Sequence, residues 1–229
     1  VQMKPLASPL LGFLLGVAVG FLLISWLLWE DVPRREPPTV PVITTNVAAK
    51  QFVEAWQQML DGSWYVQSNF ERIATDGRSA ITEVQEARRS QPPDRMRRSF
   101  GTTEIVLNGH GYSCTQAGAE VVTGVGPTSC RDVGPVDVKS ADMRSVAAVA
   151  ERTSGMKRTY DVQAMSGRCF ELYARPAAVE PGWGTFARFC FDHRTGALVE
   201  SIHRFADHVD TTKAKMVRPI EPNDIRVPA

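Results

Sequence analysis

The chain has 229 residues, with 26 lysine and arginine against 25 aspartate and glutamate residues and a formal net charge of +1. A balance so near zero argues against a nucleic-acid-binding protein, which needs a basic surplus to neutralise phosphates. Hydrophobic residues make up 43% of the chain, and they are unevenly distributed. The run from Leu6 to Trp29 contains no charged residue, whereas the remainder has the composition of one folded domain. This distribution argues against a soluble cytosolic enzyme, a disordered protein and a polytopic transporter.

The uncharged run predicts a transmembrane helix. Its 24 residues would extend about 36 Å as a helix, enough to cross a hydrocarbon core of about 30 Å. A cleaved signal peptide is the alternative, because Lys4 supplies a positive charge ahead of the run. The run is longer than the apolar region of a signal peptide, and no A-x-A site follows it. We therefore expect residues 1–30 to form a permanent anchor.

The orientation of this anchor follows from the cysteines rather than from the flanking charges. Lys4 lies on one side of the run and Arg34 with Arg35 on the other, so the positive-inside rule decides little. Four cysteines in the remaining chain, an even number, are typical of an oxidising compartment. The sequence therefore predicts a single-pass cell-membrane protein with a cytoplasmic N-terminus and an extracytoplasmic C-terminal domain.

Small residues recur every four positions within the run, at Ser8, Gly12, Gly16 and Gly20. This spacing forms one nearly straight groove, into which a second helix backbone can pack closely. The alternative is that glycine is simply common in transmembrane helices. We expect the groove to bind other membrane-protein subunits.

After the anchor, residues 31–45 carry four prolines without periodicity and predict an extended stalk. The soluble domain, residues 46–229, then begins with an amphipathic helix that ends at Gly62, because apolar residues near helical spacing precede that glycine. From Trp64 onward apolar residues alternate with period two, and Asp76-Gly77 supplies a hairpin turn.

The middle of the domain continues as hairpins. Turns are expected at Pro92-Pro93 and at Asn108-Gly109, between arms rich in apolar residues. The stretch 118–138 is rich in glycine and proline and is expected to be irregular. Ser140 is expected to cap a second helix over residues 141–154, with its apolar residues on one face: Met143, Val146, Ala147 and Ala150.

The C-terminal part predicts a further series of strands separated by short turns, over residues 159–165, 168–174, 185–192, 197–205 and 211–220. Consecutive antiparallel strands with two helices indicate an α+β fold, in which helices cover one face of a curved antiparallel sheet.

The four cysteines allow three pairings. Cys169 and Cys190 fall on adjacent predicted strands of one hairpin, and a bond between them would put Tyr173 opposite Phe186. The other two bracket the glycine-rich stretch. We therefore expect the disulfides Cys114–Cys130 and Cys169–Cys190. Metal binding is the alternative, but the sequence contains no C-x-x-C motif.

The sequence carries no catalytic signature. It has no G-x-S-x-G, H-E-x-x-H, P-loop or dinucleotide-binding motif. The four histidines fall in or beside hairpins and are interpreted as isolated surface residues. Of these, His203 and His208 are expected on opposite faces of one strand. We expect a protein that is not an enzyme and that carries no metal or cofactor.

Five arginines surround the proline turn: Arg88, Arg89, Arg95, Arg97 and Arg98. Such a cluster can bind anionic head groups or an acidic partner. The preferred interpretation is a solvated hairpin rim, partly neutralised by Glu83, Glu86 and Asp94.

The order of motifs resembles that of the LolA/LolB-like superfamily of lipoprotein carriers, lipid-binding lipoproteins and RseB-like sensor domains. The residues that carry the resemblance are, in chain order, AWQQMLDGSWYVQSNFERIATDG, PPDRMRRSF, EIVLNGHGYSC, FCFDHRTGALVES and PNDIRVP. The resemblance implies an unclosed antiparallel half-barrel, with helices over an apolar cavity that binds acyl chains or peptides. The expected cavity lining is Trp64, Val66, Phe70, Ile105, Leu107, Tyr112 and Phe191; the alternative is that these residues fill a closed core.

Two functions follow from these observations. The first is a non-enzymatic, membrane-anchored protein that binds lipid or another apolar ligand and acts as an accessory subunit of a larger membrane complex. The second, implied by the RseB-like members of the superfamily, is an envelope signalling partner that binds an anti-sigma factor or a lipoprotein.

Overall fold

The computed structural model describes residues 46–116, 128–176, 178 and 181–228. The predicted anchor, its groove of small residues and the stalk lie outside this part of the chain. Within it, neither helix combines the length and the apolar character that crossing a membrane requires.

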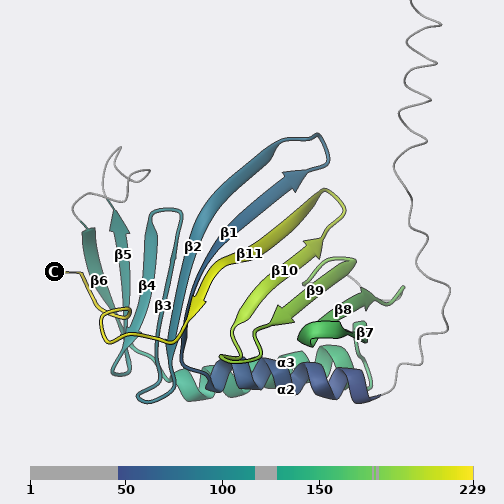
Figure 1. Ribbon diagram of the computed structural model, residues 1–229, viewed down its shortest axis with the longest axis horizontal. Helices are drawn as coiled ribbons and strands as arrows, with labels where there is room; N and C mark the ends of the chain where they lie inside the picture. The colour runs from purple at the N-terminus through teal and green to yellow at the C-terminus, as the bar shows by residue number, and fades with distance from the viewer. Residues whose placement is uncertain (1–45, 117–127, 177, 179–180, 229) are drawn as a thin grey trace, which may run out of the picture. The chain divides into compact units, whose positions relative to one another are not determined.

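The described residues form one large antiparallel sheet and two α-helices (Figure 1). The elements, in chain order, are α2 (Asn46–Asp61), β1 (Trp64–Ala74), β2 (Ser79–Arg89), β3 (Asp94–Ser99), β4 (Thr102–Leu107), β5 (His110–Gln116), β6 (Thr128–Pro135), α3 (Val138–Ser154), β7 (Tyr160–Met165), the short 3₁₀ helix η2 (Ser166–Arg168), β8 (Cys169–Ala174), β9 (Phe186–Phe191), β10 (Leu198–Arg204) and β11 (His208–Arg218).

The strand order is β6-β5-β4-β3-β2-β1-β11-β10-β9-β8-β7. Two meanders, β1 to β6 and β7 to β11, are therefore joined where the first strand pairs with the last. The two edge strands β6 and β7 do not pair with each other, so the sheet stays open. This arrangement confirms the predicted α+β class and the unclosed antiparallel sheet.

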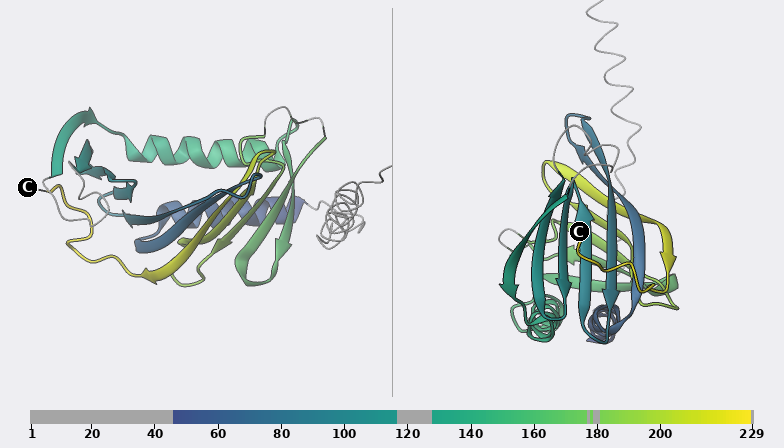
Figure 2. Two further views of the ribbon diagram at one scale, coloured as in Figure 1. Left: turned by 90° about the horizontal axis from the view of Figure 1, so that it is seen from above. Right: turned by 90° about the vertical axis from the view of Figure 1, so that its left-hand side faces the viewer.

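Helices α2 and α3 pack against each other and run across one end of the curved sheet (Figures 1 and 2). Helix α2 is amphipathic as predicted, and it buries Phe52 completely. The ring of Phe52 lies 5.4 Å from the rings of both Phe170 and Phe189, so α2 fills the inner face of the second meander with side chains.

Helix α3 begins earlier and faces differently than predicted. Its N-cap is Asp137, whose carboxylate accepts a hydrogen bond from the backbone N–H of Ser140 at 3.0 Å, so Ser140 lies inside the helix. The buried residues of α3 are Val138, Val149 and Thr153. Of the predicted apolar face, Met143 is 65% exposed and Ala147 is also exposed.

Strand β6 corrects a second prediction, because it lies in the stretch that was expected to be irregular. It pairs with β5 in a register that sets Cys130 directly opposite Cys114, and these two cysteines form a disulfide. Its few apolar residues gave no alternating pattern to read; the neighbouring strand and the covalent link supply the pairing.

Both predicted disulfides are confirmed. The second bond joins Cys169 on β8 to Cys190 on β9. In that hairpin Tyr173 lies directly opposite Phe186, as the predicted register required, and their ring centroids are 5.4 Å apart.

The C-terminal segment after β11 covers the outer face of the first meander. Ile225 packs there into a second apolar cluster with Tyr65, Met96 and Ile105. Inner and outer faces of the first meander therefore have different neighbours: the outer face meets the C-terminal segment, and the inner face borders a cavity.

Candidate ligand-binding cavity

A cavity of about 780 Å³ lies between α2 and the inner face of the first meander. This volume falls within the range of about 300–1,000 Å³ that small-molecule sites occupy. Its apolar wall comes from α2, β1 and β10, and consists of Trp56, Met59, Leu60, Trp64 and Leu198.

Hydrogen bonds fix both tryptophans of this wall. The indole N–H of Trp64 donates to the backbone oxygen of Met59 at 2.9 Å, and that of Trp56 donates to Ser145 Oγ at 3.1 Å. Gly62 permits the tight connection from α2 into β1, because a Cβ atom there would lie 2.8 Å from the backbone oxygen of Thr195. The local α2–β1 connection therefore positions the indole of Trp64, and the contact with α3 positions that of Trp56.

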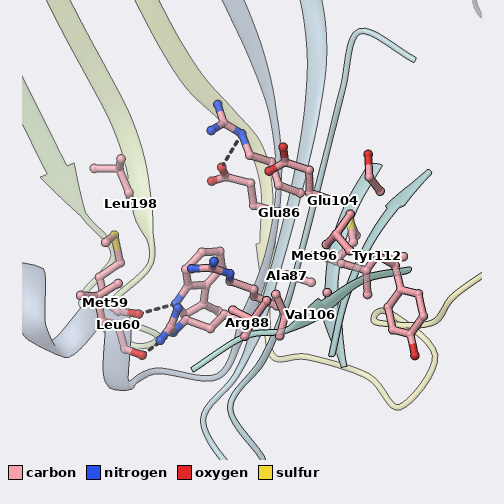
Figure 3. A pocket seen from close by; sticks show the side chains of 18 of the residues that line it. Met59, Leu60, Glu86, Ala87, Arg88, Met96, Glu104, Val106, Tyr112 and Leu198 are labelled. Atoms are coloured by element: carbon pink, nitrogen blue, oxygen red, sulfur yellow. Dashed lines mark hydrogen bonds and ion pairs between the residues drawn. The ribbon is translucent and has the colours of Figure 1, made fainter. Parts of the chain in front are cut away.

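The opposite wall is formed by the strands β2 to β6. Alternate residues of these strands face inward, and most of them are charged. Arg88 and Arg95 lie directly opposite each other on β2 and β3, and we call them the arginine row. Beside it runs the alternating row, whose members pair strand by strand from β2 to β6: Glu86, Arg97, Glu104, Ser113 and Arg131. Figure 3 shows Arg88 reaching toward Leu60, with Glu86 on the same strand, β2, and Glu104 on β4.

Two of these charges have firm partners. The guanidinium of Arg88 is buried and donates to the backbone oxygen of Leu60 and to the carboxylate of Asp142 on α3. Arg97 Nε lies 3.3 Å from Glu86 Oε1. Burial raises the pKa of the Glu86 carboxyl above its ordinary value, and the charge of Arg97 offsets part of this shift.

The cavity is therefore amphipathic, with an apolar wall from α2 and β1 and a charged wall from β2 to β6. Its described lining contains neither histidine nor cysteine. The hydroxyl of Ser113 has Glu104 and Arg131 as its cross-strand neighbours rather than a histidine base. This arrangement favours binding of a ligand with an apolar part and a charged part.

The structure separates the seven predicted lining residues into four groups. Trp64 lines the cavity, and Val66 and Phe191 are buried in the core cluster under α2. Phe70 is half-buried farther along β1, with its ring centroid 6.1 Å from that of Phe100.

The remaining three predicted residues, Ile105, Leu107 and Tyr112, belong to the outer cluster. Ile105 and Tyr112 border the cavity through their strands, but they pack into the outer cluster together with Leu107. Period two explains the difference, because Val106 and Gly111 are the inward-facing neighbours in these strands.

The histidine interpretation also needs correction. His203 and His208 lie on two strands, β10 and β11, with a turn between them, and the ring of Phe205 stacks on both. The ring of His203 also contacts that of Phe189 at 5.1 Å, and burial lowers the pKa of its imidazole. His203 is therefore a partly buried packing residue rather than an isolated surface group.

Sequence reasoning missed most of the cavity wall. The α2 residues Trp56, Met59 and Leu60 were assigned only to an amphipathic helix, and the arginines only to a solvated rim. A usable signal was present in the i, i+2 spacing of Glu86 with Arg88 and of Arg95 with Arg97, which puts each pair on one face of its strand.

Comparison with known proteins gives structural neighbours. Neither a protein-family model nor a curated protein matches the sequence. A LolA superfamily protein from Nitrosomonas europaea is similar with a TM-score of 0.30 and 8% identity, over 77% of this chain and 96% of that chain. The MucA/MucB complex of Pseudomonas aeruginosa gives a TM-score of 0.44 and 11% identity, over 80% of this chain and 61% of that chain, so this chain spans less than two thirds of that relative. The Mycobacterium tuberculosis lipoprotein LppX gives a TM-score of 0.34 and 9% identity, over 75% and 98%.

Proposed function

We propose that this protein binds a lipid or another ligand with a long apolar part in the cavity under α2, without catalysing a reaction. The observation that carries the proposal is the cavity of about 780 Å³, with two tryptophans fixed by hydrogen bonds in its wall. An aromatic and aliphatic wall favours an apolar ligand, because transfer of apolar surface from water stabilises the bound state by about 25 cal/mol per Å².

The proposal also includes the location of the protein, anchored in the cell membrane, and its role as an accessory subunit. The uncharged run Leu6–Trp29 supports a single membrane anchor, and the two disulfides support an extracytoplasmic domain. The repeated small residues in the run support an accessory role in a larger membrane complex, which the anchor would join through its groove.

Photolabelling of the full chain tests the binding function. The chain is reconstituted in phosphatidylcholine vesicles with the methyl ester of a long-chain fatty acid that carries a diazirine. After irradiation, mass spectrometry locates the labelled peptides. We expect labels on α2 and on the strands β2 to β6 that line the cavity.

Matched tryptophan substitutions distinguish cavity binding from general labelling in the bilayer. Ser113→Trp puts an indole on the charged wall and is expected to reduce cavity labelling about fivefold or more, which corresponds to a loss of about 1 kcal/mol. Lys213→Trp changes an exposed residue of β11 outside the lining and is expected to leave labelling unchanged. Equal labelling of both variants and the unmodified chain would contradict the proposal.

A further inference from the structure

The charged wall of the cavity carries an excess of arginine. Four arginines line it, in the arginine row and the alternating row, against the two carboxylates Glu86 and Glu104. Arg88 is neutralised by Asp142 and Arg97 by Glu86. Among the residues that the structure describes, the side chains of Arg95 and Arg131 have no hydrogen-bond or ion-pair partner.

Of these two arginines, Arg95 is the better candidate to bind an anionic group of the ligand. It is half-buried and lies between an apolar and a cationic neighbour. Directly opposite it on β2 is Arg88, and directly opposite on β4 is the buried Val106. Like charges in directly opposed positions of a sheet repel each other, since their Cβ atoms lie about 4.5–5.5 Å apart. Because Asp142 and Leu60 already engage Arg88, an additional anion would find its donors on Arg95.

We propose that the ligand of this cavity carries an anionic head group, a carboxylate or a phosphate, which the guanidinium of Arg95 binds. The inference rests on the proposed binding function and adds the chemistry of the head group to it. The planar guanidinium offers paired N–H donors that match the oxygens of either anion. The apolar part of the ligand then lies against Trp64 and Met59, which face the same cavity from β1 and α2.

Arg131 strengthens this preference without contacting the same head group. It lies on β6, three strands away from Arg95, at the exposed end of the alternating row. A positive charge on the cavity lining favours anionic amphiphiles over neutral ones.

Three diazirine probes with the same chain test the inference in vesicles of phosphatidylcholine: a fatty acid, its methyl ester and a phosphate monoester of the corresponding alcohol. With the full chain we expect at least one anionic probe to label the cavity about tenfold more than the methyl ester, as charge-assisted hydrogen bonds predict. The more strongly labelling anion identifies the natural class of head group.

Two charge-neutralising variants provide the matched comparison. Arg95→Gln is expected to reduce labelling by the anionic probe to the level of the ester, while continued labelling by the ester shows that the cavity is folded. Arg78→Gln removes the same charge from the exposed β1–β2 turn and is expected to change neither.

The outcomes separate the two proposals. Equal labelling by acid, phosphate and ester, or an anion preference that survives Arg95→Gln, overturns the head-group inference and leaves apolar binding intact. Absence of cavity labelling by all three probes overturns the binding function and the inference together.

Discussion

Gly184 lies where the connection between β8 and β9 meets the end of β10. It forms an isolated parallel bridge with Arg204, and its backbone oxygen accepts a hydrogen bond from the hydroxyl of Tyr160 at 3.1 Å. Its φ of +78° is in the left-handed region, and a Cβ atom would lie 2.1 Å from the backbone oxygen of Arg204. Both the conformation and the close approach require glycine at this position.

Gly184→Ala is therefore expected to destabilise the domain by about 3 kcal/mol, from about 1–2 kcal/mol of left-handed backbone strain and a comparable cost of displacing Arg204. Gly77→Ala is the control, because Gly77 has a φ of +82° but no atom within 4 Å of the added Cβ. It should cost only the backbone strain, about 1–2 kcal/mol. Urea unfolding followed by tryptophan fluorescence measures both; equal losses would contradict the account of Gly184.

At the same scale, the sequence predicts a residue's partners well only when they are local. The cysteine pairs were predictable because each lies within one hairpin or brackets one loop. The face of Ile105 and Tyr112 was not, because an apolar residue suits the outer cluster as well as the cavity, and only the position of the C-terminal segment decides between the two.

Among the larger elements, the C-terminal segment is held over the sheet in part by an ion pair. Arg218 at the end of β11 donates two hydrogen bonds to Asp224, at 2.6 and 2.7 Å, and its guanidinium lies 4.2 Å from the ring centroid of Tyr65. The hydrogen bonds from Arg218 hold the pKa of the Asp224 carboxyl below its ordinary value. This contact fixes the turn that carries Ile225 into the outer cluster.

A depressed pKa in the folded state means that the pair stabilises the domain fully above the unfolded pKa of about 3.9, and that this stability is lost as the pH falls through the lower folded value. Asp224→Asn is thus expected to cost about 1 kcal/mol at pH 7 and progressively less toward pH 2. Urea unfolding of both proteins between pH 7 and pH 2 measures how the difference in their free energies of unfolding changes with pH. Asp76→Asn, in an exposed pair with Arg78, should have little effect at any pH; an Asp224→Asn deficit that persists at pH 2 would contradict the assignment.

Most elements were predictable because the residues within each element carry the pattern that predicts it. The period-two strands, the Asp76-Gly77 and Asn108-Gly109 turns and the first helix all match the structure. The start of α3 was misread because Asp137 and Ser140 are both good caps, and the carboxylate of Asp137 is the one that binds the helix N-terminus. Strand β6 was missed because its pairing depends on β5 and a disulfide rather than on its own residues.

For the whole molecule, the groove Ser8, Gly12, Gly16 and Gly20 stays a prediction, because it lies outside the described residues. If this face packs against a second helix, Gly16→Leu introduces a bulky side chain where two backbones approach. The expected cost is about 1–3 kcal/mol, which reduces association about 5- to 150-fold. Native-gel analysis of complexes purified in mild detergent measures the partners retained.

Replacement of Val17 or Leu22 by another large apolar residue is the control, since helical spacing predicts that both lie off this face. We expect partners to be retained in these variants and lost with Gly16→Leu, while the domain formed by residues 46–228 folds equally in all. Recovery of the partners at full yield with Gly16→Leu would leave the anchor as a simple tether.

The overall topology could be predicted only in part. The hairpins follow from neighbouring segments, but the pairing that joins the two meanders connects residues such as Arg72 and Asp210, which are 138 positions apart. No local pattern marks β1 and β11 as partners. The cavity itself depends on this junction, because Leu198 from the second meander completes a wall otherwise built from α2 and the first.

The central β1–β11 pair also sets an order of events during synthesis on the ribosome. The first meander can form as soon as its own hairpins have emerged, but the backbone of β1 then has one edge without a partner until β11 is made. An unpaired strand edge is a template for association with other chains. The edge of β1 that ends up at the centre of the finished sheet is therefore exposed in the nascent chain until translation reaches β11.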